Sequence, residues 1–576
     1  MTSPSKFTPV EKIKAESNYL RGSIAEELAN PSDAFAKDTV HLLKHHGMYQ
    51  QDDRDNRVSK SSDGAKTAKA YSLLIRVKIP GGRLTADQFV AQLHLADEVG
   101  NTTLRITDRQ DIQFHGVLKR NLREAIQRIN HVELTTLGAC GDVERNVMCC
   151  PAPLRSDAVR DRLQEVAERI SLHFLPRTRA YHEIWLGDPD TGERQQVTAA
   201  PETIEPLYGR NYLPRKFKTA IALADDNCVD VYANDLGLVA IVRDGQVAGF
   251  NVLVGGGMGV TPSNKNTFPA LAKPLAFVGA DDVLPLATAL IEVFRDFGDR
   301  TDRKRARLKY LIADWGMDRF RAKVEEYYGR PLEAPKPAPI RAYHDHLGWN
   351  EQGDGLWFYG LNVENGRVLD RPGWTLKSAL REICTKLRPG IRLTPQQNIL
   401  FTDLPADYRS GLEEILCRHG VRLTEEISLA RRHSMACVAF PTCPLAVAES
   451  ERVLPALIDQ LEAELSRLGL EDEKFTTRMT GCPNGCARPY NADIGLVGKT
   501  AGKYTIYLGG RLLGDRLAVI YKDLVPLEEI VPTLVPVLVA FKSGRAEGET
   551  LGDFCHRLGR EGLKAAAAEM LMTPSG

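Results

Sequence analysis

Between residues 71 and 130 the hydrophobic pattern switches repeatedly between strand-like and helical spacing. Residues 71–79 (YSLLIRVKI) are strand-like and end at a turn that begins with Pro80. Residues 85–98 carry apolar side chains at helical spacing, residues 103–116 return to a strand pattern, and residues 122–130 are again helical. This strand–helix–strand–helix order predicts a mixed α+β unit.

The same order of elements occurs a second time in the C-terminal half of the chain. Residues 356–363 repeat the first strand and residues 376–387 repeat the first helix. The segment Arg392-Leu-Thr394-Pro-Gln-Gln397 mirrors Arg105-Ile-Thr107-Asp-Arg-Gln110, at an offset of 287 residues (394 minus 107). A repeat this long indicates a duplicated half and not a solenoid. We therefore expect a functional site where the two halves meet.

The likeness between the halves continues beyond these units. Met148-Cys149-Cys-Pro151 lies near the offset of Met435-Ala-Cys437, and we align Cys149 with Cys437 at an offset of 288 (437 minus 149). The segments 234–239 and 491–497 are also alike. Four spaced cysteines occur only in the second half of the sequence. The pattern thus predicts a cluster in one half and a charged ligand bound by the other.

The four cysteines of the second half have a spacing typical of metal or cluster ligands. Five residues separate Cys437 from Cys443, and three separate Cys482 from Cys486. Thiolates favour zinc, copper(I) or iron–sulfur clusters. Zinc knuckles usually separate paired cysteines by about two to four residues, so the wider gap favours a loop around something larger than one ion. The spacing by itself favours a 4Fe–4S cluster and leaves open zinc or four unrelated core cysteines.

Composition excludes several classes of partner. Lys plus Arg and Asp plus Glu both number 75, so no basic excess points to nucleic acid or to a membrane surface. The most apolar stretch, residues 524–541, contains two glutamates and three prolines and does not predict a membrane span. The first twenty residues lack the apolar core of a secretory signal, and eleven cysteines in such a chain fit a reducing cytoplasm. Five of these cysteines are expected to be buried free thiols: Cys140, Cys228, Cys384, Cys417 and Cys555.

Cationic side chains lie beside turns and glycines at several points around the duplicated core. Any one of them is more often a solvated surface charge, but their concentration favours a polyanionic ligand. In Lys216-Phe-Lys218 the two ammonium groups share one face if the segment is extended. The others are Arg76, Arg105, Arg109, Arg145, Arg215 and the group Arg300, Arg303, Lys304, Arg305 and Arg307.

Over nearly its whole length, the chain resembles the sirohaem- and 4Fe–4S-containing sulfite and nitrite reductase family. The combination of both cysteine pairs with Leu213-Pro-Arg-Lys-Phe-Lys218 is specific to this resemblance. Residues 487–490, just after the last cysteine, match the family only loosely and carry no expected role. The matching stretches are residues 16–21, 46–54, 107–116, 213–218, 251–257, 437–443 and 480–486.

The resemblance implies an α+β, internally duplicated, three-lobed fold. Two ferredoxin-like half-domains and two sirohaem- and iron–sulfur-type α/β lobes are expected around a pseudo-twofold axis. The implied boundaries are an N-terminal arm over 1–70 that docks a partner or wraps the body, half-domains over 71–137 and 346–423, an anion-binding lobe over 138–345 and a cluster lobe over 424–576.

The resemblance also implies one sirohaem, one 4Fe–4S cluster and a role for each matching residue. Cys437, Cys443, Cys482 and Cys486 are expected to hold the cluster, with Cys486 also bridging to the sirohaem iron. Arg109, His115 and Asn484 are expected to contact the macrocycle. The catalytic anion site is expected to consist of Arg76 and Arg145, which bind, and Lys216 and Lys218, which supply protons.

The implied reaction is the six-electron reduction of sulfite to hydrogen sulfide. The sequence has no Gly-x-Gly-x-x-Gly opening a helix after a strand, so NADPH is expected to act only through a separate flavoprotein (alpha) subunit carrying FAD and FMN. A ferredoxin-dependent sulfite or nitrite reductase is the alternative. Lys218 stands where nitrite reductases usually have asparagine, which favours sulfite. A non-catalytic zinc or iron–sulfur scaffold is the remaining alternative, and neither nucleic acid nor membrane is expected as a partner.

Overall fold

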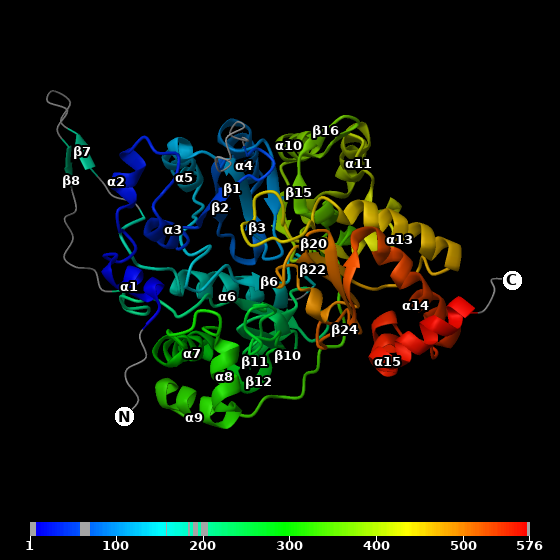
Figure 1. The fold of residues 1–576 in the computed structure, drawn as a ribbon. Coiled ribbons are helices and arrows are strands. Elements are labelled where there is room, and N and C mark those ends of the chain that lie inside the picture. Colours follow the sequence, from blue (N-terminus) through cyan, green and yellow to red (C-terminus); the bar gives the residue numbers. More distant parts are fainter. Residues whose placement is uncertain are drawn as a thin grey trace, which may run out of the picture.

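The computed structural model describes residues 7–57, 69–156, 158–181, 185–187, 194–196 and 205–572. Its helices and strands form two half-domains that lie side by side, with one lobe below them and a second lobe beside them (Figure 1). The expected mixed and internally duplicated architecture is confirmed.

Each half-domain is a five-stranded sheet with helices packed against it. The first contains β1 (Met48–Asp52), β2 (Tyr71–Val77), β3 (Arg83–Leu84), α4 (Ala86–Val99), β4 (Leu104–Ile106), β5 (Ile112–Val117) and α5 (Leu122–His131). The second contains β13 (Gly348–Glu351), β14 (Trp357–Leu361), β15 (Arg367–Val368), β16 (Asp370–Arg371), β17 (Trp374–Thr375), α10 (Leu376–Lys386), β18 (Gly390–Leu393), β19 (Ile399–Leu404) and α11 (Arg409–Arg418).

The two half-domains exchange a short strand. The first sheet has the order β1-β2-β5-β4-β15 and the second β13-β14-β19-β18-β3, so each is completed by a strand from the other half. Leu84 of β3 lies opposite Ile391, and Val368 of β15 lies opposite Leu104. Gly82, before β3, has φ +73°, and a Cβ there would lie 2.5 Å from the carbonyl oxygen of Leu393. Only glycine allows this close approach. One hydrophobic core runs through both half-domains.

Each lobe is built on a five-stranded mixed sheet, and the two sheets have the same pattern of three parallel and two antiparallel strands. The first lobe contains β6 (Met148–Cys149), α6 (Val159–His173), β9 (Thr219–Leu223), β10 (Leu236–Arg243), β11 (Gln246–Val254), β12 (Lys273–Gly279), α7 (Val283–Phe297), α8 (Leu308–Trp315) and α9 (Met317–Tyr328), with a separate hairpin of β7 (Trp185–Gly187) and β8 (Arg194–Gln196). The second contains α12 (Leu429–Arg432), β20 (Ser434–Ala436), α13 (Leu454–Leu468), β21 (Thr477–Thr480), β22 (Ile494–Thr500), β23 (Lys503–Leu508), β24 (Val519–Pro526), α14 (Ile530–Gly544) and α15 (Leu551–Met572).

Strand register fixes which residues of the two lobes are equivalent. Thr219 lies opposite Leu236 as Thr477 lies opposite Ile494, which gives an offset of 258 (219 to 477) from β9 onward. At this offset Cys228 is the counterpart of Cys486.

The register of the preceding strand corrects one expected alignment. Met148 lies opposite Ala220, and Met435 lies opposite Arg478, so Met148 is equivalent to Met435. Cys150, and not Cys149, is therefore the counterpart of Cys437, at an offset of 287 (150 to 437). A shift of one residue turns a strand side chain to the other face. The thiol of Cys149 accordingly points toward α6, 3.2 Å from Oε1 of Gln164.

The N-terminal segment forms three helices, α1 (Pro9–Glu16), α2 (Ile24–Ala29) and α3 (Lys37–Leu43), followed by strand β1. Strand β1 (Met48–Asp52) lies inside the expected arm and pairs along its length with β2. Leu20 and Leu43 are fully buried, one in the core of the first lobe and one in the half-domain core. Residues 9–54 thus pack on the body of this chain.

Two other expectations concern exposure and membranes. Cys417 was expected to be buried, but it is exposed on α11 because the buried face of this helix carries Leu412, Ile415 and Leu416 instead. Within the described residues, no helix is long and apolar enough to cross a membrane. The apolar stretch near residues 524–541 is divided between β24 and α14.

Candidate active site

A pocket between the two lobes collects side chains from both halves of the chain. Its first-lobe wall contains Gly257, Gly259 and the cations Lys216, Lys218 and Arg307. The first half-domain adds Arg109 from the turn before β5, and the second-lobe wall contains the loop after β21. Among the side chains that line the pocket are Arg109, Lys216, Lys218 and Arg307 from the first half and Asn484, Cys486 and Arg488 from the second.

Lys216 and Lys218 point into this pocket from one extended segment. Phe217 between them is fully buried, and its isolated bridge to Glu144 holds the backbone extended. Both ammonium groups therefore lie on the same face, as the sequence predicts. Burial, followed by the charge of Arg109, lowers the pKa of Lys218 to about 7. Burial and the neighbouring charge of Lys218 lower the pKa of Lys216 well below its ordinary value. With a pKa of about 7, Lys218 can give up a proton near neutral pH.

Arg109 is held rigidly at the base of the pocket. Its Nη1 donates to Oδ1 of Asn234 at 2.9 Å, and its Nη2 donates to the carbonyl of Asn146 at 2.6 Å. Nε of Arg109 is buried without a hydrogen-bond partner among the described residues. The guanidinium thus retains donor capacity for a ligand.

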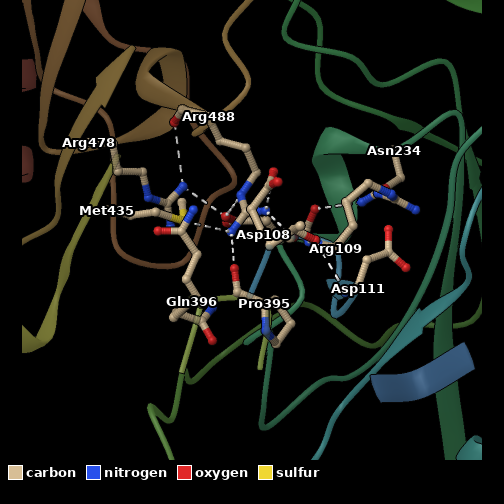
Figure 2. Close-up of polar contacts among 12 residues, drawn as sticks. Asp108, Arg109, Asp111, Asn234, Pro395, Gln396, Met435, Arg478 and Arg488 are labelled. Carbon is tan, nitrogen blue, oxygen red and sulfur yellow. Dashed lines mark hydrogen bonds and ion pairs between the residues drawn. The ribbon is translucent and has the colours of Figure 1, made fainter. Parts of the chain in front are cut away.

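Arg488 is the site residue that the sequence analysis missed (Figure 2). It donates to the carbonyls of Asp108 at 3.0 Å and Pro395 at 2.9 Å, which are equivalent positions of the two halves (108 to 395). It also pairs with Asp230 at 2.5 Å, and Asp230 is its own counterpart in the first lobe (230 to 488). Arg488 therefore lies on the pseudo-twofold axis. The available signal was its position two residues after Cys486.

The four cysteines of the second lobe lie on two neighbouring loops. Cys437 follows β20, Cys482 and Cys486 follow β21, and the loops are joined by hydrogen bonds from Val447 and Ala448 to the carbonyl of Gly481. Gly481 N–H donates to Sγ of Cys437 at 3.3 Å, and Nδ2 of Asn484 donates to Sγ of Cys482 at 3.4 Å. Backbone and amide donors therefore already face the sulfur atoms.

Burial and the neighbouring thiols raise the pKa values of three of the four cysteines. Burial and then the charge of Cys486 raise the pKa of Cys482 to about 11, and the same two causes raise the pKa values of Cys437 and Cys443. Thiols that oppose one another's ionisation need a cation or a metal cluster to become thiolates. Within the described residues, the four do not form a group whose ligand atoms all lie within 4.8 Å of one another, as a single ion requires. Their arrangement fits a larger group.

Six sequence-predicted site residues lie outside the lining of this pocket: the cysteines Cys437, Cys443 and Cys482, and also Arg76, Arg145 and His115. Burial and then the neighbouring Cys140 raise the pKa of the Tyr49 hydroxyl, and the charges of Arg145 and Arg76 oppose this rise, so both arginines lie near Tyr49. Nε of Arg145 donates to the carbonyl of Gly141 at 2.8 Å. His115 is buried, and neither ring nitrogen has a hydrogen-bond partner among the described residues. Burial, followed by Arg367, lowers the pKa of His115 well below its ordinary value, so the imidazole is neutral.

Comparison with known proteins agrees with this duplicated architecture. The family model for the nitrite/sulfite reductase ferredoxin-like half domain matches residues 66–132 and 350–419. The model for the nitrite and sulphite reductase 4Fe-4S domain matches residues 165–332 and 430–574.

Individual relatives match over nearly their whole length. The NADPH sulfite reductase hemoprotein beta-component of Staphylococcus haemolyticus is 44% identical over 555 residues, covering 96% of this chain and 95% of the relative. The ferredoxin sulfite reductase of Synechococcus elongatus is 42% identical over 573 residues, covering 97% and 91%. Among solved structures, the Mycobacterium tuberculosis NirA protein superimposes with a TM-score of 0.78 at 27% identity, covering 97% of this chain and 98% of that one. The chain belongs to the nitrite and sulphite reductase family.

Proposed function

We propose that this chain is the haemoprotein (beta) component of an NADPH-dependent sulfite reductase, which reduces sulfite to hydrogen sulfide. The observation that carries the proposal is the pocket between the lobes, where Lys216, Lys218 and Arg109 face Cys486. Near full-length similarity to relatives named as sulfite reductase beta-components supports the same reaction.

The residues present fit a 4Fe–4S cluster and a haem-type group, for which we propose sirohaem, one of each per chain. Cys437, Cys443, Cys482 and Cys486 would hold the cluster, because they lie on two neighbouring loops whose backbone and amide donors face the sulfurs. Cys486 would also help to hold the haem-type group, because its side chain is exposed and lines the pocket. Together, the two bound groups would supply the electrons and the iron centre to which sulfite binds.

The cations of the pocket would bind the anionic groups. Arg109, with its unpartnered Nε, and Asn484 are proposed to hold the carboxylates of the macrocycle. His115 is proposed as a further contact, since its two buried and unpartnered nitrogens make it a free neutral donor and acceptor. Arg76 and Arg145 do not line this pocket. They are nevertheless proposed to bind sulfite oxygens, because a guanidinium stays charged and offers several donors in a fixed plane.

Lys216 and Lys218 are proposed as the source of protons. Reduction of one sulfite dianion to hydrosulfide and three waters consumes six electrons and seven protons, so each departing oxygen needs protons nearby. Burial and neighbouring cations lower the pKa of both lysines, which makes an ammonium a competent acid near neutral pH. The same charges would stabilise negative charge that develops on the oxygens as the S–O bonds lengthen.

The electron donor is proposed to be a separate flavoprotein (alpha) component carrying FAD and FMN. The beta-component names of the relatives imply such a partner. A ferredoxin donor is the second candidate, favoured by the 42% identity to the ferredoxin sulfite reductase of Synechococcus elongatus. With a ferredoxin donor, neither this chain nor its partner would use NADPH.

The experiment is an assay of the purified holo-protein with sulfite, using reduced methyl viologen, a flavoprotein partner with NADPH, or reduced ferredoxin as separate donors. We expect sulfide from sulfite with methyl viologen, and faster NADPH-driven than ferredoxin-driven turnover. Absence of sulfide with every donor from protein that contains both iron chromophores would overturn the proposed function. A preference for ferredoxin would retain the reaction and replace the partner.

A further inference from the structure

A second group of metal-ligating side chains lies in the first lobe, away from the pocket. Cys150 directly follows β6, Asp226 and Cys228 lie in the loop after β9, and His346 lies in the linker just before β13. One ligand atom from each residue lies within 4.8 Å of all the others. The proposed sulfite reaction uses none of these four residues.

The contacts within this group are short and converge on one point. Sγ of Cys150 lies 3.0 Å from Oδ2 of Asp226 and 3.6 Å from Nε2 of His346. Nε2 of His346 lies 2.9 Å from the same carboxylate oxygen. Ligand atoms around a tetrahedral zinc ion are about 3.3 to 3.8 Å apart, given zinc–ligand distances of about 2.0 to 2.3 Å. Movements of a few tenths of an ångström would therefore make room for an ion.

All four side chains are removed from solvent. Asp226 and Cys228 are fully buried, Cys150 is 2% exposed, and His346 is 8% exposed. Buried carboxylate, imidazole and thiol groups are costly unless they are paired or bind a metal. We propose that Cys150, Asp226, Cys228 and His346 bind one structural zinc ion.

The charge of the surroundings suits a zinc ion. Two thiolates, a carboxylate and a neutral imidazole around Zn²⁺ carry one net negative charge. Nη2 of Arg160 lies 3.6 Å from Oδ2 of Asp226 and supplies the balancing positive charge. Sulfur and imidazole ligands are those that zinc prefers, and four protein ligands in a closed position are typical of structural rather than catalytic zinc.

The surrounding hydrogen bonds hold the ligands in position. Oδ1 of Asp226 accepts from the N–H of Cys228 at 3.2 Å, which leaves Oδ2 directed at the group. Gln396 Nε2 donates to the carbonyl of Cys228, and Gln396 is the counterpart of Arg109 (109 to 396). Such partners orient metal ligands before the metal binds.

The duplication gives an independent reason for a metal at this place. Cys150 is the counterpart of Cys437 and Cys228 that of Cys486, so the two cysteines occupy the positions of two proposed cluster ligands. Asp226 likewise corresponds to Asn484 (226 to 484). The first lobe thus has its own ligand set on the same two loops. A bound ion would tie those loops to the linker that joins the halves.

The test is the metal content of the holo-protein expressed with added zinc, followed by X-ray absorption at the zinc edge, which iron does not obscure. We expect about one zinc per chain and two sulfur ligands at about 2.3 Å. Iron and sulfide production are measured in the same samples, so failure of the proposed function and failure of the zinc site are distinguishable. Wild-type protein that holds no zinc after incubation with zinc chloride would overturn the proposal, as would zinc without sulfur ligands or a Cys150–Cys228 disulfide.

Variants then assign the ligands. C228S and H346A should each lower zinc affinity at least about 100-fold while iron content is retained. The matched control is C384S, which alters a buried cysteine in the half-domain core and should keep its zinc. Zinc retained in both ligand variants would contradict the assignment. If either variant fails to fold, the absorption spectrum of the wild-type protein decides alone.

Discussion

In the first lobe the loops after β6 and β9 carry Cys150 and Cys228 and are closed, with the second thiol fully buried. In the second lobe the equivalent loops carry Cys437 and Cys486, and the second thiol is exposed at the pocket. The strand frame is the same, with matching order and register. One scaffold thus holds a closed ligand set in the first lobe and an open one in the second, and access to the pocket distinguishes the two. Structural metal sites are closed, whereas reactive ones keep an open position.

The largest expected effect separates the two equivalent cysteines. Cys486→Ser removes the thiolate proposed to join the two iron groups, so sulfite reduction should fall to background and the visible spectrum should lose its coupled chromophore. Cys228→Ser should leave both the iron content and the spectrum intact. Absorption spectra, iron analysis and methyl viologen turnover of the two variants provide the measurement. Equal turnover in wild type and Cys486→Ser would show that the open position is not the reactive one.

Much of this frame could be predicted from sequence, for physical reasons. Hydrophobic periodicity marks α4 and α10 because amphipathic helices bury one face, and cysteine spacing marks the cluster loops. The exchanged strands β3 and β15 are two residues long and too short to have a period. The pairing of Cys437 with Cys150 depends on a strand register that adjacent cysteines leave ambiguous.

Arg488 could not be predicted because its role depends on the assembled interface. Its partners Asp108, Asp230 and Pro395 come from three distant segments. Arginine also stands at position 488 where the first lobe has Asp230, so comparison of the two halves alone would not identify it. Its left-handed φ of +56° is likewise a property of the folded loop.

The second-largest expected effect comes from removing Lys218, one of the pocket cations that the first lobe supplies. The counterpart of Lys218 in the second lobe is Thr476 (218 to 476). Thr476 is buried, and its Oγ1 donates to Oδ2 of Asp493 at 2.7 Å. Lys218→Asn should lower kcat/KM for sulfite about 100-fold and for nitrite about tenfold, since sulfite needs more charge compensation at its oxygens. Kinetics with both anions and a chemical reductant decide, with the exposed Lys304→Asn as control. Equal losses on both substrates would mean that Lys218 acts only as a structural cation.

The same lysine makes a prediction about pH. Burial and then the charge of Arg109 lower the pKa of Lys218 to about 7, so Lys218 loses its proton as the pH rises through that value. Turnover limited by this proton should therefore fall about 16-fold between pH 7 and 8.5. Lys218→Arg should bind sulfite but show low turnover with a flatter pH profile, because arginine stays protonated. An unchanged falling limb in this variant would assign the titration to another group.

A smaller effect is expected at the axis itself. Asp230 pairs with Arg488 at 2.5 Å and with Arg478 at 2.7 Å, all of them buried. Arg488→Met removes one partner of a buried carboxylate and should destabilise the interface between the lobes by about 3 kcal/mol. The half-exposed pair of Arg452 with Asp55 provides the control, since Arg452→Met should cost less than about 1 kcal/mol. Denaturant midpoints and limited proteolysis measure both changes.

Exchange of the two axis residues sharpens this test. The double variant Asp230→Arg with Arg488→Asp keeps an ion pair between positions 230 and 488, with the two charges exchanged. Arg478 would then face a new arginine, and its counterpart in the first lobe is the neutral Ala220 (220 to 478). We therefore expect no rescue. Recovery of wild-type stability would show that the two halves are electrostatically interchangeable at the axis, against the comparison above.

The smallest expected effect concerns the N-terminal segment, whose strand β1 is equivalent to β13 of the second half-domain. Strands β1 and β13 occupy the same edge of their sheets, and the glycines at their starts, Gly47 and Gly348, both have positive φ. After β13, Gln352 accepts at its carbonyl the N–H of Arg155, in the loop that follows Cys150. After β1, Arg54 donates to the carbonyls of Cys443, of Ala446 at 3.0 Å and of Pro441 at 3.2 Å. Each edge segment thus holds one ligand loop.

Arg54→Ala should therefore loosen the loop of Cys443 without unfolding the body. Loss of these part-buried, charge-assisted bonds is expected to destabilise the loop by about 1 to 2 kcal/mol and to speed bleaching of the iron chromophores in air several-fold. The matched controls are Arg57→Ala, whose guanidinium bonds Asp52 in its own segment, and Arg155→Ala; both should leave bleaching unchanged. Methyl viologen and NADPH-driven activities should fall together. A selective loss of the NADPH-driven rate would instead assign Arg54 to docking of the flavoprotein, as an arm built for a partner requires.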